Sequence, residues 1–397
     1  MMPLSFGQSS SMTPDITALT STTNRFAFDL YDQLATEDNL FVSPFSISLA
    51  LAMTYGGANG ETATQMQDVL GFDLPTRDLA NLLGDLSDDL ESREGFTLNL
   101  ANALWAQEDS RFEPEFLLMS RLDYGATLRN LDFRMASNEA RRTINAWVNQ
   151  ATNGIIPELL PSNAVTPDTR LILTNAIYFN ALWQFPFDPD ATELNPFNAF
   201  GRESLVPTMR QTRQFTYSEG DTYQTLRLPY QGETTSMLIV LPRDGAFTAV
   251  SDDLASTYDT ALANQSTRRV NVELPRFEMR SSFDLATTLS NLGMPLAFTP
   301  YTPASYCETG LSGSGADFSK LDGSRCLFID SVIHEAYIDA NETRTEAAAA
   351  TAVAMARTTS AANHLPPVDF IADRPFMVII HDEISGAILF MGQVVSP

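Results

Sequence analysis

Apolar positions in the first part of the chain recur with a helical period. Residues 23–35 (TNRFAFDLYDQLA) place their apolar side chains on one face, which predicts a helix. A second helix is expected to start at Ser43–Pro44, because proline suits the first helical position, and to stop at Gly56–Gly57. Residues 75–92 form an acidic amphipathic pattern, and residues 136–154 show a helical period that ends in glycine. These patterns predict helices.

Other segments have the pattern of strands. Residues 96–107 (FTLNLANALWAQ) alternate, and residues 170–185 are too apolar for a strand with one exposed face, which predicts a central position in a sheet. Residues 282–294 predict one more helix, ending at Gly293. Further strands are expected at 236–244, 269–280 and 325–339, and a hairpin around Glu383–Gly386 within 374–397.

Length and composition agree with a single large α+β domain. Hydrophobic residues make up 44% of the 397 residues, enough for a sizeable core. We find no repeat period and no linker long enough to separate domains. The longest apolar stretch, 376–395, is interrupted by His381, Asp382 and Glu383, so no membrane span is expected. The N-terminus lacks the basic start and apolar run of a signal peptide, which leaves a cytoplasmic protein or a different mature start as alternatives.

The charge balance excludes some partners. The net charge is −25, with a pI near 4.3, which argues against binding to nucleic acid or to anionic membranes. Lys320 is the only lysine. An acidic, lysine-poor surface is typical of proteins that work in high salt, and a GC-rich genome that favours arginine is the alternative explanation.

The two cysteines, Cys307 and Cys326, flank a stretch rich in Gly and Ser that reads as a loop. A disulfide between them would stabilise the fold by about 3 kcal/mol. Two free thiols are the alternative, because the compartment is unknown.

Motifs for catalysis or metal binding do not stand out. His334, His364 and His381 have no metal-ligand spacing to one another or to a cysteine. The stretch GLSGSG at 310–315 misses the spacing of a nucleophile elbow, and Lys320 is followed by leucine, so it is not part of a phosphate loop. We therefore expect a protein that is not an enzyme and needs no cofactor or metal. A hydrolase with non-local catalytic groups is the weaker alternative.

Six segments, in order, resemble the serpin family of serine protease inhibitors, in its prokaryotic form. They are SPFSI with GGANGET (43–62), AWVNQATNG (146–154), LTNAIYFNALWQFPF (173–187), LPRFEMRSSFDLATTLSNLGM (274–294), IDSVIHEAYIDANETRTEAAAATAV (329–353) and RPFMVIIHDEISGAILFMGQVVSP (374–397). The resemblance runs from about residue 20 to the end. It implies an N-terminal extension (1–20), one serpin domain (21–397) with three β-sheets and eight or nine helices, and an exposed reactive loop at about 342–365.

The alanine run within residues 341–355 is the most informative segment. Alanine is the best helix former, so a surface helix is the simple interpretation. The resemblance implies instead that this hinge becomes a new central strand after the loop is cleaved. In a strand, side chains alternate between two faces. One face would carry Thr345, Ala347, Ala349, Thr351 and Val353; the other would carry Arg344, Glu346, Ala348, Ala350 and Ala352. The first set is small and uncharged, and both charges fall on the second, so the pattern suits insertion into a packed sheet.

Arg344 departs from the family pattern, because inhibitors of the family usually have glycine at this position. Arginine removes backbone freedom where the loop first folds in, so we expect slower insertion. This residue supports the alternative function, a non-inhibitory serpin that acts as a binding or chaperone-like module.

The resemblance implies inhibition by a one-use suicide mechanism. A target serine protease cleaves the loop, forms an acyl-enzyme and is trapped in a covalent complex when the hinge inserts. The expected protein is a monomer, and the family role favours an extracellular location. A heparin-like cofactor is not expected, since residues 75–92 are acidic where a basic patch would be needed.

The resemblance also assigns roles to single residues. Ser43, Ser46, Asn175 and His334 match a polar cluster beneath the sheet opening. Trp183 matches a residue at the top of the opening, where Glu342 at the base of the hinge would pair with Arg276. The usual spacing from Glu342 puts the reactive bond at Thr358–Thr359. A register one residue shorter gives Arg357–Thr358, a trypsin-type site, and Met355–Ala356 is the third candidate.

Overall fold

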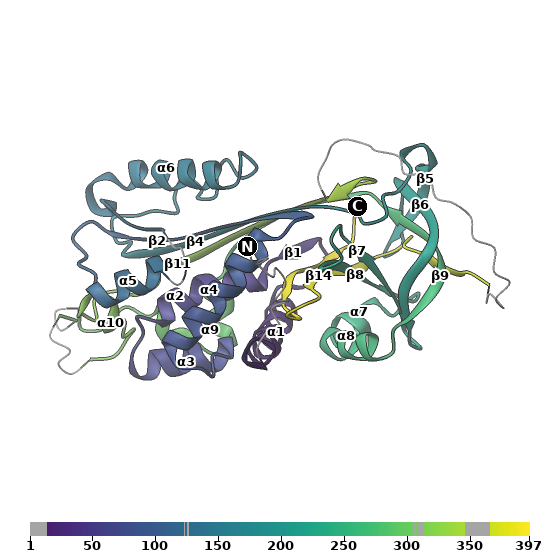
Figure 1. Ribbon diagram of the computed structural model, residues 1–397. Helices are drawn as coiled ribbons and strands as arrows, with labels where there is room; N and C mark the ends of the chain where they lie inside the picture. The colour runs from purple at the N-terminus through teal and green to yellow at the C-terminus, as the bar shows by residue number, and fades with distance from the viewer. Residues whose placement is uncertain (1–13, 123, 125–126, 305–306, 309–312, 346–365) are drawn as a thin grey trace, which may run out of the picture.

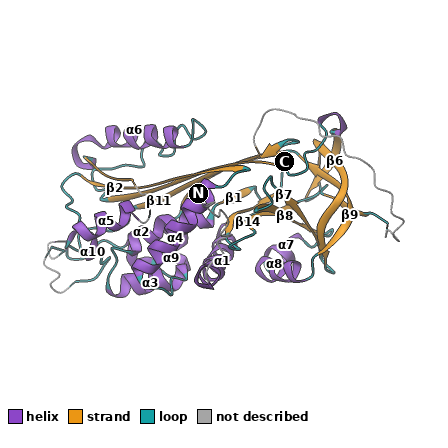
Figure 2. Ribbon diagram, in the orientation of Figure 1, coloured by secondary structure: helices purple, strands orange, loops and turns teal. Residues whose placement is uncertain are grey.

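Two sheets and the helices that pack on them make up the protein (Figures 1 and 2). The computed structural model describes residues 14–122, 124, 127–304, 307–308, 313–345 and 366–397. The long strands β2, β4 and β11 run along one half of the molecule, with α6 on one side and α2, α3, α4 and α9 on the other (Figure 1). Strands β6 and β9 lie at the other end, with α7 and α8 below them in this view.

The described residues form ten α-helices. They are α1 (Pro14–Leu34), α2 (Pro44–Tyr55), α3 (Gly60–Leu70), α4 (Thr76–Ser92), α5 (Pro114–Leu122), α6 (Phe133–Ala151), α7 (Phe247–Ser251), α8 (Leu254–Ala263), α9 (Ala286–Leu292) and α10 (Ser319–Asp322). Two short 3₁₀ turns, η1 (Pro189–Ala191) and η2 (Pro295–Phe298), accompany them.

The strands divide into two hydrogen-bonded sheets. The six-stranded sheet has the order β10-β11-β12-β4-β2-β3, and its members are β2 (Phe96–Gln107), β3 (Thr127–Leu131), β4 (Leu171–Leu182), β10 (Phe277–Asp284), β11 (Ser331–Ala340) and β12 (Arg344–Thr345). We call it the central sheet. The nine-stranded sheet contains β1 (Leu40–Val42), β5 (Glu193–Ala199), β6 (Arg202–Glu219), β7 (Tyr223–Pro229), β8 (Thr235–Pro242), β9 (Ser266–Pro275), β13 (Val368–Ile371), β14 (Phe376–Asp382) and β15 (Ile388–Val394).

The central sheet is buried on both faces. Alternate residues of β4 such as Leu173 and Ile177 pack into the main core with α2, whereas Ile172 and Ala176 pack into a smaller core beneath α6. A strand covered on both faces is continuously apolar, which explains the unbroken hydrophobic run of β4.

The α+β fold class and most expected elements are confirmed. The helix start at Ser43 is a true N-cap, whose side chain accepts a hydrogen bond from the Ser46 N–H. Strand β2 has the expected bounds, and the C-terminal hairpin is present as β14 and β15. Among the described residues, no helix is long and apolar enough to cross a membrane.

Four details differ from expectation. The three expected sheets form two hydrogen-bonded sheets, because the 18-residue strand β6 pairs with β5 along residues 202–208, with β9 along 208–217 and with β7 at its end. Ten α-helices replace the expected eight or nine, since the short α7 and α10 are included. The strand expected over 325–339 begins only at Ser331. Helix α1 begins at Pro14, within the expected extension.

Candidate functional site

The candidate site is a seam in the central sheet where β4 and β11 run parallel. Seven residue pairs join them, from Ser331↔Ile172 to Tyr337↔Tyr178. At one end of this seam, the short strand β12 lies between the same two strands. Thr345 pairs with Ala181 of β4 and with Ala340 of β11. A third strand, described up to Thr345, therefore lies between β4 and β11 beyond the end of their direct pairing at Tyr337↔Tyr178.

A buried polar cluster lies beneath the seam. Its members Ser43, Ser46, Asn175 and His334 come from the start of α2, from β4 and from β11, and all four are fully buried. The Ser43 N–H donates to His334 Nε2 at 3.1 Å, and Ser43 Oγ donates to the Leu389 carbonyl at 2.6 Å. Asn175 Nδ2 donates to the Ser46 carbonyl at 2.8 Å and also contacts Ser46 Oγ. The structure thus brings these four predicted residues together.

The hydrogen bonds define the charge state of His334. Its Nε2 accepts from a backbone N–H, so the proton must be on Nδ1, which donates to Asn175 Oδ1. Burial lowers the pKa of His334 to about 3, so the imidazole is neutral at ordinary pH. Because Asn175 and His334 are directly opposed in the ladder, their bond joins the two strands across the seam.

Sequence reasoning missed Asn102, which extends this cluster. Asn175 Nδ2 contacts Asn102 Oδ1, and Asn102 lies opposite Asn175 in the β2–β4 ladder. The available signal was an asparagine within the otherwise apolar run 100–106, because a polar side chain buried there requires a hydrogen-bond partner.

Trp183 closes the end of the seam where β12 enters. It is almost fully buried and stacks on Tyr230, with ring centroids 4.7 Å apart. Its Nε1 donates to the Asn341 carbonyl at 2.8 Å, and its backbone N–H donates to the Thr343 carbonyl at 3.2 Å. Trp183 therefore fixes the segment that leads from β11 into β12.

Glu342 is held at the same place by the predicted partner. Arg276 Nε donates to Glu342 Oε1 at 2.7 Å, and Thr192 Oγ1, which the sequence did not indicate, donates to the same oxygen. The Glu342 side chain is buried, so it is not the solvated charge of a surface pair. Burial alone would raise the pKa of this carboxyl, but the bonds from Arg276 and Thr192 outweigh it and hold the pKa below its ordinary value.

The remaining loop predictions lie outside the described residues. This applies to the hinge residues Glu346, Ala347, Ala348, Ala349, Ala350 and Thr351 and to the reactive-bond candidates Met355, Ala356, Arg357, Thr358 and Thr359. For Arg344 and Thr345 the structure gives the backbone pairing of β12. Away from the seam, Cys307 and Cys326 form a disulfide, which decides between the two alternatives left by the sequence.

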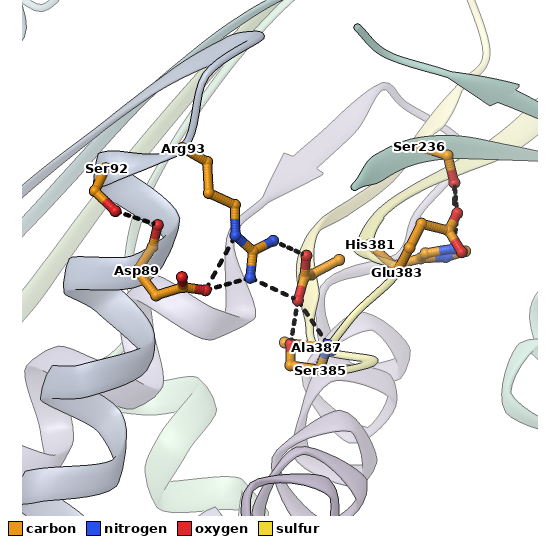
Figure 3. A network of polar contacts seen from close by, with 9 residues as sticks. Asp89, Ser92, Arg93, Ser236, His381, Glu383, Ser385 and Ala387 are labelled. Atoms are coloured by element: carbon orange, nitrogen blue, oxygen red, sulfur yellow. Dashed lines mark hydrogen bonds and ion pairs between the residues drawn. The ribbon is translucent and has the colours of Figure 1, made fainter. Parts of the chain in front are cut away.

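A second polar network connects α4 and β8 with the β14–β15 hairpin (Figure 3). Arg93, which follows α4, forms ion pairs with Asp89 and with the fully buried Asp382. Asp382 also accepts from the Ser385 N–H at 2.7 Å and from Ser385 Oγ at 2.6 Å. These contacts anchor the start of β2 to the hairpin.

Ser236, His381 and Glu383 have the residue types of a hydrolytic triad but not its arrangement (Figure 3). In such a triad the serine contacts Nε2 and the acid contacts Nδ1 of the histidine. Here Ser236 Oγ and Glu383 Oε1 both contact Nε2 of His381, at 3.2 and 3.0 Å. The cluster therefore has the geometry of a structural network. The described part of the chain also contains no group of metal-ligating side chains.

Comparison with known proteins agrees with this geometry. A family model described as serpin (serine protease inhibitor) matches residues 21–397. An uncharacterized serpin-like protein of Thermococcus kodakarensis is 39% identical over 380 residues, which cover 94% of this chain and 84% of that protein. The human leukocyte elastase inhibitor is 37% identical over 394 residues, covering 96% and 99% of the two chains. The crystal structure of human thyroxine-binding globulin with thyroxine has a TM-score of 0.83 at 28% identity, covering 96% of this chain and 99% of the other. With the family model spanning nearly the whole chain and such relatives aligned along their length, this protein belongs to the serpin family.

Proposed function

We propose that the protein inhibits serine proteases as a one-use suicide substrate. The protease's serine Oγ attacks the carbonyl carbon of Thr358, the bond to the Thr359 nitrogen breaks, and that nitrogen leaves as an amine with the proton that the serine gave up. The freed hinge then inserts between β4 and β11 and carries the acylated protease with it. Small displacements of the oxyanion hole and triad are enough to slow deacylation.

The observation that carries this proposal is the register of β12. Arg344 pairs with Leu182 and Thr345 with Ala181, in antiparallel order. Continued in this register, the strand would place residues 348–354 opposite residues 172–178 of β4. Those β4 residues are the ones now paired with β11. The residues that would replace β11 read AAATAVA, the smallest side chains of the segment.

The same register explains the sorting of side chains in the hinge. Residues 347, 349, 351 and 353 would lie opposite Phe179, Ile177, Asn175 and Leu173, which face the main core. Close packing there admits little added volume, and these hinge residues are alanine, threonine and valine. Glu346 would lie opposite the half-buried Asn180 on the other face, where a charge can reach water. The charge pattern seen in the sequence thus fits the two faces of the seam.

Insertion requires the polar cluster to rearrange. The ladder pair His334↔Asn175 is one of the seven that must separate, and the hydrogen bond between these side chains spans the seam. Together with the pair that the buried Glu342 forms with Arg276, it would hold the native sheet closed against a more stable inserted form.

The test is to mix the protein with trypsin, pancreatic elastase and subtilisin in turn and to run denaturing gels. We expect a band at the summed mass that survives detergent. The mass of the released C-terminal peptide identifies the bond among Thr358–Thr359, Arg357–Thr358 and Met355–Ala356. Clean cleavage by all three enzymes with no such band would contradict inhibition by this class.

A non-inhibitory binding role is the second candidate, and Arg344 favours it, because arginine restricts the backbone at the first inserted position. The structural relative solved with thyroxine bound shows that this fold also serves binding. Replacing Arg344 with glycine discriminates the two functions. A variant that forms the covalent complex where the natural chain is only cleaved would support the binding role for the natural chain.

A further inference from the structure

The turn between β5 and β6 has an unusual residue at its first position. Ala199 pairs with Arg202, so Phe200 and Gly201 form a two-residue turn, and both have positive φ angles, 50° and 86°. These angles belong to a type I′ turn, in which asparagine or aspartate usually precedes the glycine. A bulky side chain in this left-handed region strains the backbone. The turn itself therefore gives no reason for a phenylalanine at this position.

The ring of Phe200 forms part of the wall of a hollow. The hollow measures about 490 Å³, the size of a small-ligand site, and lies among the β5–β6 turn, the loop from β8 to α7 and the loop from β13 to β14. The Phe200 ring meets the Phe247 ring edge to face, with centroids 5.2 Å apart, yet Phe200 remains 46% exposed. A strained turn thus holds aromatic surface open to the hollow.

The two arginines that line the hollow are already engaged by the protein. Arg374 Nε donates to the Pro242 carbonyl at 2.8 Å, and Arg374 Nη1 donates to Asp373 Oδ1 at 2.6 Å. Arg243 Nη2 donates to a carboxylate oxygen of Glu219, at the end of β6, at 3.2 Å. Neither guanidinium therefore requires an anion from solution as its partner.

Asp244 supplies a carboxylate that is not engaged in this way. Of the two carboxylates that line the hollow, Asp373 is paired, whereas Asp244 has no hydrogen bond among the described residues. The nearest cation to Asp244 is Arg374 Nε at 3.5 Å, and the single hydrogen of that nitrogen goes to the Pro242 carbonyl. The side chain of Asp244 is 96% exposed, at the rim of the hollow. Its charge is therefore available to a ligand.

Aromatic rings and an available carboxylate in one hollow suit an organic cation. The face of an aromatic ring attracts positive charge, and quaternary ammonium groups are typical ligands of such rings. The net charge of −25 adds a long-range attraction for cations. A metal ion would instead need several oxygen ligands, and the described part of the chain contains no group of metal-ligating side chains.

We infer that this hollow binds a small alkylammonium ligand, whose cationic head lies on the ring of Phe200 and is balanced by the carboxylate of Asp244. Asn198 and Thr248, which also line the hollow, offer polar groups to the remainder of such a ligand. The inference goes beyond the proposed inhibition of proteases and does not depend on it.

Choline is the probe for this site, and its neutral analogue, with a tert-butyl group in place of the trimethylammonium group, is the control ligand. Each is titrated into the natural protein at an ionic strength held constant with sodium chloride, and saturation-transfer NMR follows the methyl signals. We expect saturable binding of choline in the millimolar range, with its methyl signal shifted upfield by the phenylalanine rings. The neutral analogue should bind at least about tenfold more weakly.

Three variants test the assigned residues. Phe200→Asn puts a preferred residue into the type I′ turn, so it should keep or raise the melting temperature while weakening choline binding at least about tenfold. Asp244→Asn should also weaken binding about tenfold. Asp109→Asn is its matched control, because it removes an exposed carboxylate that does not line the hollow, and it should leave binding unchanged.

The inference would be overturned by the absence of saturable choline binding, or by equal affinities for choline and the neutral analogue. Unchanged binding to Phe200→Asn would overturn it too. Should Phe200→Asn melt earlier than the natural protein, Asp244→Asn and Asp109→Asn decide, because both change exposed carboxylates, and equal choline binding by these two would refute the assignment. The assay contains no protease, so none of these results bears on the proposed inhibition.

Discussion

Lowering the pH is expected to destabilise the folded protein through His334. In the fold, the imidazole is neutral, because burial penalises its charged form and its Nε2 already accepts a hydrogen bond from the Ser43 N–H. In the unfolded chain the same side chain titrates near its ordinary pKa. Below that value the unfolded state binds a proton that the folded state excludes, so stability is complete above pH 6.5 and falls as the pH drops toward 3.

The size of the effect follows from the two pKa values. With a pKa of 6.5 in the unfolded chain and about 3 in the fold, protonation of His334 lowers the free energy of unfolding, relative to pH 8. The loss is about 2 kcal/mol at pH 5 and about 3 kcal/mol at pH 4. Other groups also titrate over this range. A variant that lacks only the His334 contribution is therefore needed to isolate it.

His334→Gln supplies that comparison. A glutamine amide can accept from the Ser43 N–H and donate toward Asn175, but it cannot take up a proton. Urea denaturation of both proteins at pH 8 and pH 5 gives the free energy of unfolding from the first transition of each denaturation curve. We expect the natural protein to lose about 2 kcal/mol more than the variant between the two pH values. Equal losses would refute the reasoning that burial keeps His334 neutral.

Three further predictions address the hinge, the polar network and the disulfide. In the proposed register residue 347 faces the core, so Ala347→Arg should still be cleaved but should give at least about tenfold less covalent complex on gels. Glu346→Arg, on the outer face, should form as much covalent complex as the natural chain. Arg93→Ala leaves Asp382 buried without its cation and should cost about 3 kcal/mol in urea unfolding, against under about 1 kcal/mol for Arg134→Ala at an exposed pair. Reducing the disulfide should lower stability by about 3 kcal/mol without changing complex formation, since it lies away from the seam.

Local patterns predicted the elements whose determinants lie close together in the sequence. Ser43 and Pro44 predicted the start of α2, and the alternation of residues 96–107 predicted β2. Helix α6 begins three residues before the predicted 136, because the side chain of Asp132 caps it by accepting from the Met135 N–H.

The strands β5 to β7 escaped prediction for a physical reason. Their residues alternate weakly, since the outward face of the β5–β6 hairpin carries leucine and proline where a polar pattern would mark exposure.

Contacts between distant residues gave no local signal. Arg93 and Asp382 are 289 positions apart, and Thr192 reaches Glu342 across 150. The family resemblance supplied the pairing of Glu342 with Arg276 and the four-residue polar cluster, but it did not supply Asn102. A buried asparagine requires a hydrogen-bond partner, whereas only the fold determines which residue lies close enough to be that partner.

The placement of the tryptophans has a spectroscopic consequence. All three lie on or against the central sheet: Trp105 on β2 meets Trp147 of α6 edge to face at 5.5 Å, and Trp183 stacks on Tyr230 at the end of the seam. Tryptophan fluorescence of the natural chain, excited selectively over its tyrosines, therefore originates entirely from the part of the molecule that insertion would deform. A change in tryptophan emission after loop cleavage would follow the inserting hinge strand without an attached dye. It would respond first as the strand passes Trp183 and then as the strand reaches the Trp105–Trp147 pair.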